Sequence, residues 1–228
     1  MRRRLRPCGP PSSSRAAVVN LLLITGLTLA LLATMGTPDA QADFDFEFLG
    51  QYGHKMSVTI DKGGHYHISH IIYESRSSWL KYSTNRSGTW VTERLTYASG
   101  NELYTSAIAL DSRGSVHIAY ISGREVLHLT NSTGDWETAP IAKGIDDLAD
   151  PGLSRLAIDD EDCLHLSYND WEEIGYATAC GDDWRTYAVP ETEATYSGVN
   201  VHALALDARN RPHISYKGQN GLRHAVLE

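Results

Sequence analysis

The alternation of apolar and polar residues along the chain recurs four times and predicts short β-strands. Each repeat holds an apolar stretch ending at an aspartate, then a turn, then a second apolar stretch that opens with a histidine six residues after the aspartate. The four pairs are Asp61/His67, Asp111/His117, Asp159/His165 and Asp207/His213. Successive aspartates are 50, 48 and 48 residues apart. A nearly constant period of this length indicates one supersecondary unit used four times.

The first two stretches of each repeat show the period of two that a β-strand requires. The first stretches span 57–60, 107–110, 155–158 and 203–206, and the second span 67–70, 117–120, 165–168 and 213–216. The aspartate between them can accept hydrogen bonds from the amides two and three residues further on. Gly64, Gly114 and Asn210 tolerate positive φ at the fourth turn position, and Asp162 is a poorer residue there. We therefore expect tight hairpins.

A third and a fourth stretch complete the unit. The third stretches span 80–82, 127–129, 174–176 and 222–224, and the fourth begin at Trp90, Trp136 and Trp184. Four antiparallel strands in about 48 residues are typical of a propeller blade. The expected fold is therefore all-β, a four-bladed β-propeller. Its blades cover approximately 55–96, 104–142, 153–189 and 200–227 plus 43–49.

The fourth repeat stops after its third stretch, and residues 43–49 alternate acidic residues with Phe44, Phe46 and Phe48. We expect this segment to be the outer strand of the last blade, closing the ring within one chain and removing its open edges. A fragment of a larger ring, or two chains that form one eight-bladed ring, remain alternatives.

Residues 1–42 have the layout of a secretory signal peptide, and 43–228 form the predicted propeller domain. Five arginines precede an apolar run over 16–35, and a small-residue site follows at Ala40-Gln41-Ala42. An uncleaved membrane anchor is the alternative, because the run approaches the length that spans a bilayer. We expect a secreted or periplasmic protein with no other membrane contact.

The charge balance argues against nucleic acid as a partner. The whole chain has a net charge of −8, and without residues 1–42 it holds 15 basic and 27 acidic residues, a net charge of −12. An acidic surface of this size repels phosphate backbones. We expect a monomer that binds no nucleic acid.

Two cysteines follow the leader, Cys163 and Cys180. If the strands beside them form an antiparallel hairpin that turns near Trp171 and Glu172, the two cysteines lie opposite each other. We therefore predict a disulfide, which is compatible with an oxidising compartment. The alternative is a pair of free thiols, since a slip of one residue would point them apart.

The residues also resemble bacterial sialidase-type repeat propellers, of the BNR or Asp-box kind. Their blades carry an Asp-x-x-Gly-x-x-His-Ile-Ser-Tyr stretch, then Leu-Lys-Tyr-Ala, then Gly-x-Trp, and the match covers residues 55 to 227. The segment 83–90 looks like a degraded Asp-box in which Asn85 replaces the aspartate. The resemblance implies the fold, because such blades serve glycosidases, lectin-like modules and other proteins.

Candidate binding residues come from the loops, where repeats on a rigid scaffold differ. Aromatic residues beside acids suit sugar rings, whose C–H faces stack on indole and phenol. The candidates are Tyr52, Tyr73, Trp79, Tyr104, Trp171 and Tyr196, beside Glu102, Asp146, Asp147, Asp150, Glu172 and Glu173. Ordinary, partly buried loop anchors are the alternative interpretation. The acidic run 145–150 could hold calcium. No other cofactor is expected.

The four repeated histidines invite a metal hypothesis. Because the position recurs in every repeat, we interpret them as hydrogen-bonding groups between blades. The expected function is an exported recognition module for a carbohydrate or a cell-envelope polymer. Alternatives are a sialidase-like glycoside hydrolase, for which no catalytic residue can be selected, and a protein-binding scaffold.

Overall fold

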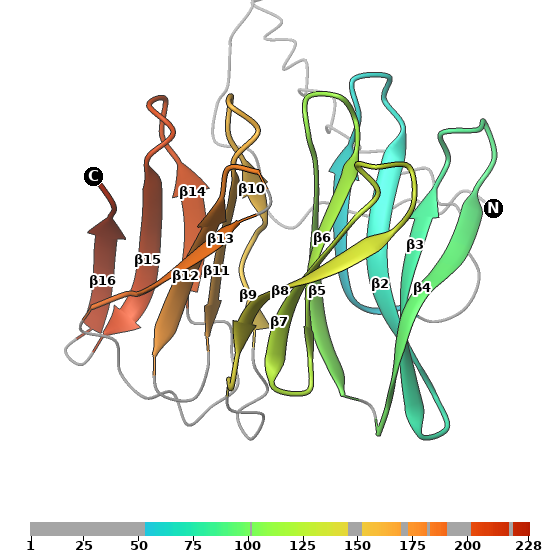
Figure 1. Ribbon diagram of the computed structural model, residues 1–228, viewed down its shortest axis with the longest axis horizontal. Coiled ribbons are helices and arrows are strands. Elements are labelled where there is room, and N and C mark those ends of the chain that lie inside the picture. Colours follow the sequence, from blue (N-terminus) through green and yellow to red (C-terminus); the bar gives the residue numbers. More distant parts are fainter. Residues whose placement is uncertain are drawn as a thin grey trace, which may run out of the picture. The chain divides into compact units, whose positions relative to one another are not determined.

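The computed structural model describes residues 53–100, 102–145, 152–169, 173–181, 183–190, 202–218 and 221–228. Every regular element in these ranges is a β-strand, and the strands form four antiparallel sheets that follow one another in chain order (Figure 1). The prediction of an all-β chain built from repeated antiparallel sheets is confirmed. None of the described segments is a helix long and apolar enough to cross a membrane.

Sheets 1 and 2 have four strands each, hydrogen-bonded in sequence order. Sheet 1 consists of β1 (His54–Ile60), β2 (Tyr66–Glu74), β3 (Ser77–Thr84) and β4 (Val91–Ser99). Sheet 2 consists of β5 (Leu103–Leu110), β6 (Val116–Ser122), β7 (Glu125–Thr130) and β8 (Glu137–Lys143). Each is the four-stranded hairpin array that the repeat predicts.

Sheet 3 departs from this plan because its inner strand is split. It consists of β9 (Gly152–Leu153), β10 (Ala157–Ile158), β11 (Leu164–Asn169), β12 (Ile174–Ala179) and β13 (Trp184–Ala188). Both β9 and β10 pair with β11. The inner strands of sheets 1 and 2 shift register in the same region. In sheet 3 the irregularity separates two short strands, although the Ser154 amide still donates to the Ser167 carbonyl at 2.9 Å.

Sheet 4 has three strands among the described residues: β14 (His202–Leu206), β15 (Pro212–Gly218) and β16 (Gly221–Val226). The segment 43–49, predicted as its outer strand, lies outside the described residues. Closure of a ring by that segment therefore stays a prediction.

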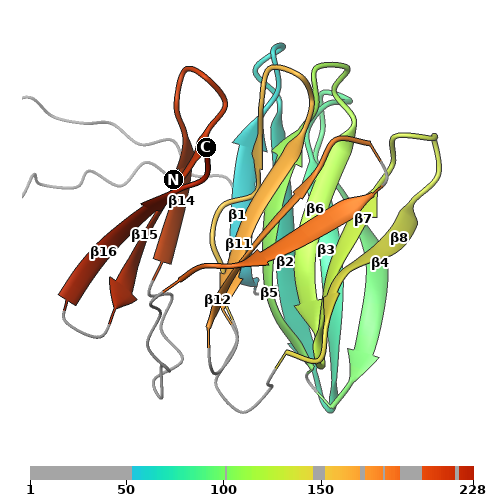
Figure 2. The ribbon, with the colours of Figure 1, turned by 60° about the vertical axis from the view of Figure 1, so that its left-hand side comes forward.

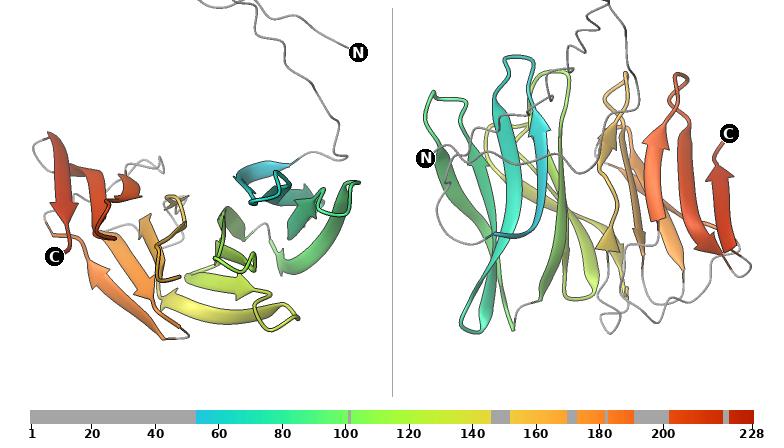
Figure 3. Two further views of the ribbon diagram at one scale, coloured as in Figure 1. Left: turned by 90° about the horizontal axis from the view of Figure 1, so that it is seen from above. Right: turned by 180° about the vertical axis from the view of Figure 1, so that it is seen from behind.

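The core is divided into layers because each sheet has two different faces. The forward face is the one turned towards the next sheet in the sequence, and the backward face is turned towards the preceding sheet. The layer between sheets 1 and 2 joins Ile71 and Leu80 of sheet 1 to Ile108 and Ile118 of sheet 2. Similar layers lie between sheets 2 and 3 and between sheets 3 and 4. The sheets accordingly stand in sequence order along a curve (Figure 3).

The aspartate turns join the two innermost strands of each sheet. Asp61 Oδ1 accepts hydrogen bonds from the amides of Gly63 and His65, both at 2.8 Å, and the other three turns are built in the same way. The bonded amides are two and four residues on, which corrects the predicted two and three. The third amide instead donates to the backbone carbonyl of the aspartate. The predicted positive φ at this position is confirmed, with values of 82°, 83°, 61° and 62° for Gly64, Gly114, Asp162 and Asn210.

Gly175 allows the closest side-chain approach in sheet 3. A Cβ added there would lie 2.6 Å from the Tyr168 hydroxyl oxygen and would overlap the ring of this buried tyrosine. We expect Gly175→Ala to lower the free energy of unfolding by about 1–3 kcal/mol, because the tyrosine must leave its packed position. Denaturant unfolding measures the change. Gly88→Ala would not be a suitable control, because Gly88 has a positive φ that alanine disfavours. Thr186→Ala, at an exposed position of strand β13, is the control. An unchanged midpoint for Gly175→Ala would contradict the prediction.

Candidate functional site

The sheets present two different ends. The turn end carries the four aspartate turns at 61–64, 111–114, 159–162 and 207–210, and the loop end carries the β2–β3 hairpin and its counterparts (Figures 1 and 2). The predicted aromatic binding residues were assigned to the loop end. Tyr52, Trp171 and Tyr196 lie outside the described residues, which leaves Tyr73, Trp79 and Tyr104.

The three described aromatic candidates make different contacts. The Tyr73 hydroxyl donates to the Leu103 carbonyl at 3.0 Å. Trp79 lies beside Tyr97, with ring centroids 5.1 Å apart, and the Arg94 guanidinium stands over the indole at 4.6 Å. Tyr104 packs against the core layer between sheets 2 and 3. Each candidate therefore has its own surroundings, and whether any of them binds a ligand stays a prediction.

The repeated histidines bridge the turn aspartate to the third strand. His67 Nδ1 lies 2.5 Å from the Tyr82 hydroxyl, and His67 Nε2 lies 3.5 Å from Asp61 Oδ2. The other three sets are Asp111–His117–His128, Asp159–His165–Tyr176 and Asp207–His213–His224. The histidine Nε2 lies within hydrogen-bond distance of the aspartate in sheets 3 and 4, whereas His67 Nε2 and His117 Nε2 have no hydrogen-bond partner among the described residues. The repeated histidines of the first three sheets, His67, His117 and His165, are buried. This burial supports the interpretation of the repeated histidines as hydrogen-bonding groups of the scaffold.

Burial makes the imidazoles of His67, His117 and His128 poor proton acceptors. Desolvation lowers the pKa of His67 and His117, and it lowers that of His128 to about 3, with a further contribution from the neighbouring His117. Across the described ranges no three His, Cys, Asp or Glu side chains are placed to hold a metal ion. Residues 146–150 of the acidic run considered for calcium lie outside the described residues.

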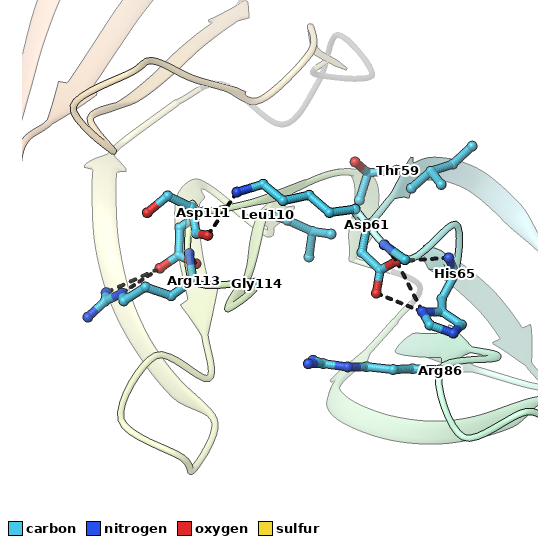
Figure 4. Close-up of a pocket in the computed structure, with 12 residues that line it drawn as sticks. Thr59, Asp61, His65, Arg86, Leu110, Asp111, Arg113 and Gly114 are labelled. Atoms are coloured by element: carbon cyan, nitrogen blue, oxygen red, sulfur yellow. Dashed lines mark hydrogen bonds and ion pairs between the residues drawn. The ribbon is translucent and has the colours of Figure 1, made fainter.

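A pocket opens at the turn end between sheets 1 and 2 (Figure 4). Its volume is about 440 Å³, within the range typical of small-molecule sites. Two aspartate turns form its walls, Asp61–Gly63 from sheet 1 and Asp111–Gly114 from sheet 2. The apolar side chains of Ile60 and Leu110 contribute to the lining. The pocket thus combines an apolar surface with polar groups from two repeats.

The two carboxylates of the pocket are already engaged. The His65 amide bonds to the Asp61 carboxylate and lowers its pKa. Burial tends to raise the pKa of Asp111, but hydrogen bonds from Ser115 and Arg113 outweigh it and the net pKa is lowered. Both groups are therefore ionised and accept bonds from their own turns. They support the pocket walls rather than offering a free acid or base.

The cationic side chains are the groups available to a ligand. Lys62 Nζ donates to the Ser112 carbonyl at 3.3 Å across the pocket. Arg86 points from sheet 1 towards the turn of sheet 2 (Figure 4), and no carboxylate in the described parts of the chain forms an ion pair with it. Its turn is held in place because Asn85 Oδ1 accepts a hydrogen bond from the Tyr66 amide at 2.8 Å. The arrangement can donate several hydrogen bonds to an oxygen-rich ligand.

Sequence reasoning did not select Arg86 or Lys62. Arg86 belongs to the segment 83–90 that looks like a degraded Asp-box, and Lys62 is a variable turn residue. The available signal was that both residues differ from those at the equivalent positions of the other repeats. The equivalents of Lys62, for example, are Ser112, Asp160 and Ala208. Their proximity depends on how two sheets pack, which the repeat alone does not specify.

No known protein-family model matches the chain, and no curated protein matches it in sequence. Solved structures with similarity include the intramolecular trans-sialidase of Ruminococcus gnavus in complex with oseltamivir carboxylate, at 12% identity and a TM-score of 0.47, covering 77% of this chain and 42% of that one. A mutant of the NanB sialidase of Streptococcus pneumoniae has 15% identity and a TM-score of 0.47, with 77% and 32% coverage. A bifunctional GH43-CE protein of Bacteroides eggerthii has 12% identity and a TM-score of 0.43, with 76% and 24% coverage. The chain spans less than half the length of each of these proteins.

Proposed function

We propose that the chain is an extracytoplasmic recognition module of the β-propeller type, in which each sheet is a blade, and that it binds a carbohydrate. The observation that carries this proposal is the pocket at the turn end, where Lys62 and Arg86 face a partly apolar wall. Sugars combine many oxygen acceptors with apolar C–H faces, so they match such a lining. The Cys163–Cys180 disulfide supports a location outside the cytoplasm.

The ligand class follows from the charges of the pocket. Asp61 and Asp111 are saturated by their own turns, whereas the Arg86 guanidinium retains hydrogen-bond donors that are suited to a carboxylate. A saccharide that carries a carboxylate therefore fits better than a neutral one. The net negative charge of the protein disfavours binding of polyanions to the rest of its surface. We therefore expect an acidic saccharide to bind at this pocket and not elsewhere.

Replacement of Arg86 by alanine tests the site. A charge-assisted hydrogen bond contributes about 1.5–3 kcal/mol, so we expect Arg86→Ala to weaken binding of an acidic saccharide about ten- to a hundredfold. A glycan array first identifies a ligand, and titration calorimetry then compares the variants. Arg185→Ala, at an exposed position of β13, is the matched control and should bind like the unmodified protein. Equal binding by Arg86→Ala would refute the assignment.

The loop end remains the alternative binding surface. Its aromatic residues were proposed from sequence for stacking on sugar rings, and Trp79 has one face covered by Arg94. In the same titration, a loss of affinity in Trp79→Ala but not in Arg86→Ala would move the site to that end. Sialidase-like hydrolysis, a protein-binding scaffold and ring closure by residues 43–49 stay predictions from the sequence.

A further inference from the structure

Three junctions between sheets bury a forward face against a backward face, and two further faces have no neighbouring sheet among the described residues. Strand contacts link sheet 1 to sheet 2, sheet 2 to sheet 3, and sheet 3 to sheet 4. Among the described strands no contact of comparable extent links sheet 4 to sheet 1. The backward face of sheet 1 and the forward face of sheet 4 therefore stand at the two ends of the curve (Figure 3).

The inner strand of sheet 1 shows that its backward face is built for burial. Val58 pairs with Ile68 as Ile108 pairs with Ile118 and Leu204 with Ile214. The residues equivalent to Val58 are Ile108, Leu156 and Leu204, which are 4%, 1% and 6% exposed. Val58 itself is 60% exposed, and Ile60 on the same face is 57% exposed. Val58 thus has a buried counterpart at every other junction, and the counterparts of Ile60 are partly buried against the core layers, so the exposure of both side chains indicates a missing neighbour.

The forward face of sheet 4 shows the same contrast. Leu222 pairs with Lys217 as Leu80 pairs with Ile71, and the equivalent residues Leu80, Val126 and Ile174 are 0%, 0% and 2% exposed. Leu222 is 86% exposed. A hollow of about 490 Å³ lies on this sheet and is lined in part by Ala203, Ser215, Lys217 and Leu222. Such a hollow can receive the side chains of an inner strand.

A recurring tryptophan contact across the junctions indicates which residues of these two faces would meet. Trp136 of sheet 2 packs edge-on against Tyr82 of sheet 1, with centroids 5.5 Å apart, and Trp184 of sheet 3 packs in the same way against His128, at 5.4 Å. The same position holds Tyr176 in sheet 3 and His224 in sheet 4, the last sheet of the chain, where His224 is exposed. The corresponding tryptophan is Trp90 of sheet 1. Its buried Nε1 has no hydrogen-bond partner among the described residues, whereas Trp136 Nε1 donates to Glu93 of the preceding sheet.

We propose that a second copy of this chain covers both faces. Sheet 1 of each copy packs its backward face, through Val58 and Ile60, on the forward face of sheet 4 of the other copy, around Leu222. Two copies related by a two-fold axis then make two identical junctions and form a ring of eight sheets. A second copy is the occupant because it offers both missing faces at once, each with the chemistry already used three times within the chain. This arrangement differs from the monomer expected from the sequence.

Molecular mass in solution tests the proposal. The protein is expressed from the full sequence and purified as the cells process it. Light scattering should then give a molecular mass equal to two copies. Val58→Asp and Leu222→Asp should each give the mass of one copy, because either change buries a carboxylate in an apolar junction. Val91→Asp, at an exposed apolar position on the outer strand β4, should leave the mass at two copies.

The alternatives predict different results. One-copy mass for the unmodified protein would overturn the proposal. If Val58→Asp then also lowered the melting temperature markedly, the two faces would be packed together within one chain. Two-copy mass that neither aspartate variant reduces would likewise overturn it, since the contact would lie elsewhere.

A crosslinking experiment tests the head-to-tail arrangement directly. Chains carrying Val58→Cys and chains carrying Leu222→Cys are produced together and treated with a short thiol-reactive crosslinker. A covalent dimer should form in the mixture and not in either variant alone, because the two positions meet only between different copies. A crosslinked dimer in each single variant would contradict the proposed junction.

Discussion

Removal of the Cys163–Cys180 disulfide is expected to lower the free energy of unfolding by about 3 kcal/mol, the loop-entropy value for a closed loop of this size. The bond connects β11 to β12 beyond their last paired residues, Leu164 and Ala179, and closes a loop over a sequence separation of 17. In the unfolded chain it restricts this loop, so its loss makes unfolding more favourable. For a domain of this length the change corresponds to a fall of roughly 6–12 °C in melting temperature.

Calorimetry of the double variant Cys163→Ala, Cys180→Ala provides the measurement. A reductant should lower the melting temperature of the unmodified protein to a similar extent and should leave the double variant unchanged. If the double variant melts at the temperature of the oxidised protein, the bond does not contribute to stability.

Acid is expected to destabilise the protein through the His117–His128 pair. The pKa of His128 is about 3 in the folded state, against 6.5 for the free side chain, chiefly because burial disfavours its charged form. A group whose pKa is lowered by folding contributes full stability above pH 6.5 and loses it as the pH falls towards 3. At pH 4.5 the loss is on the order of 2–3 kcal/mol, since each pKa unit corresponds to about 1.4 kcal/mol.

The repeat itself supplies the test variant. Tyr82 and Tyr176 occupy the position of His128 in sheets 1 and 3 and hydrogen-bond the histidine of their own sheet. His128→Tyr should therefore keep a partner for His117 while removing one titrating group. We expect urea midpoints measured from pH 7.5 to 4.5 to fall less steeply in this variant. His54→Gln, at an exposed position, should retain the original slope, and equal slopes in all three proteins would contradict the assignment.

The hairpins and the hydrogen-bonding histidines could be predicted because they depend on local chemistry. An aspartate that accepts its own turn amides, and Gly or Asn at the position of positive φ, identify the turn without knowledge of neighbouring sheets. The disulfide followed from the register of the same hairpin, which places Cys163 beside Cys180. Within one repeat, short-range rules were sufficient.

The split inner strand of sheet 3 and the pocket could not be predicted. The separation of β9 from β10 has no signal in the alternation over 155–158. The pocket requires Arg86 of one sheet and Asp111 of the next to line the same cavity, which depends on the distance and rotation between the sheets. Loop aromatic residues were a weaker guide because a tyrosine such as Tyr73 can equally serve as an anchor for the adjoining strand.

Because each sheet has a forward face and a different backward face, the sheets can pack on one another in one direction only. Because every inner junction joins the same kind of forward face to the same kind of backward face, a repeat inserted by gene duplication would meet fitting surfaces on both sides. The end surfaces would not change. Repeat number can therefore vary in evolution without any redesign of the contacts that join one repeat to the next.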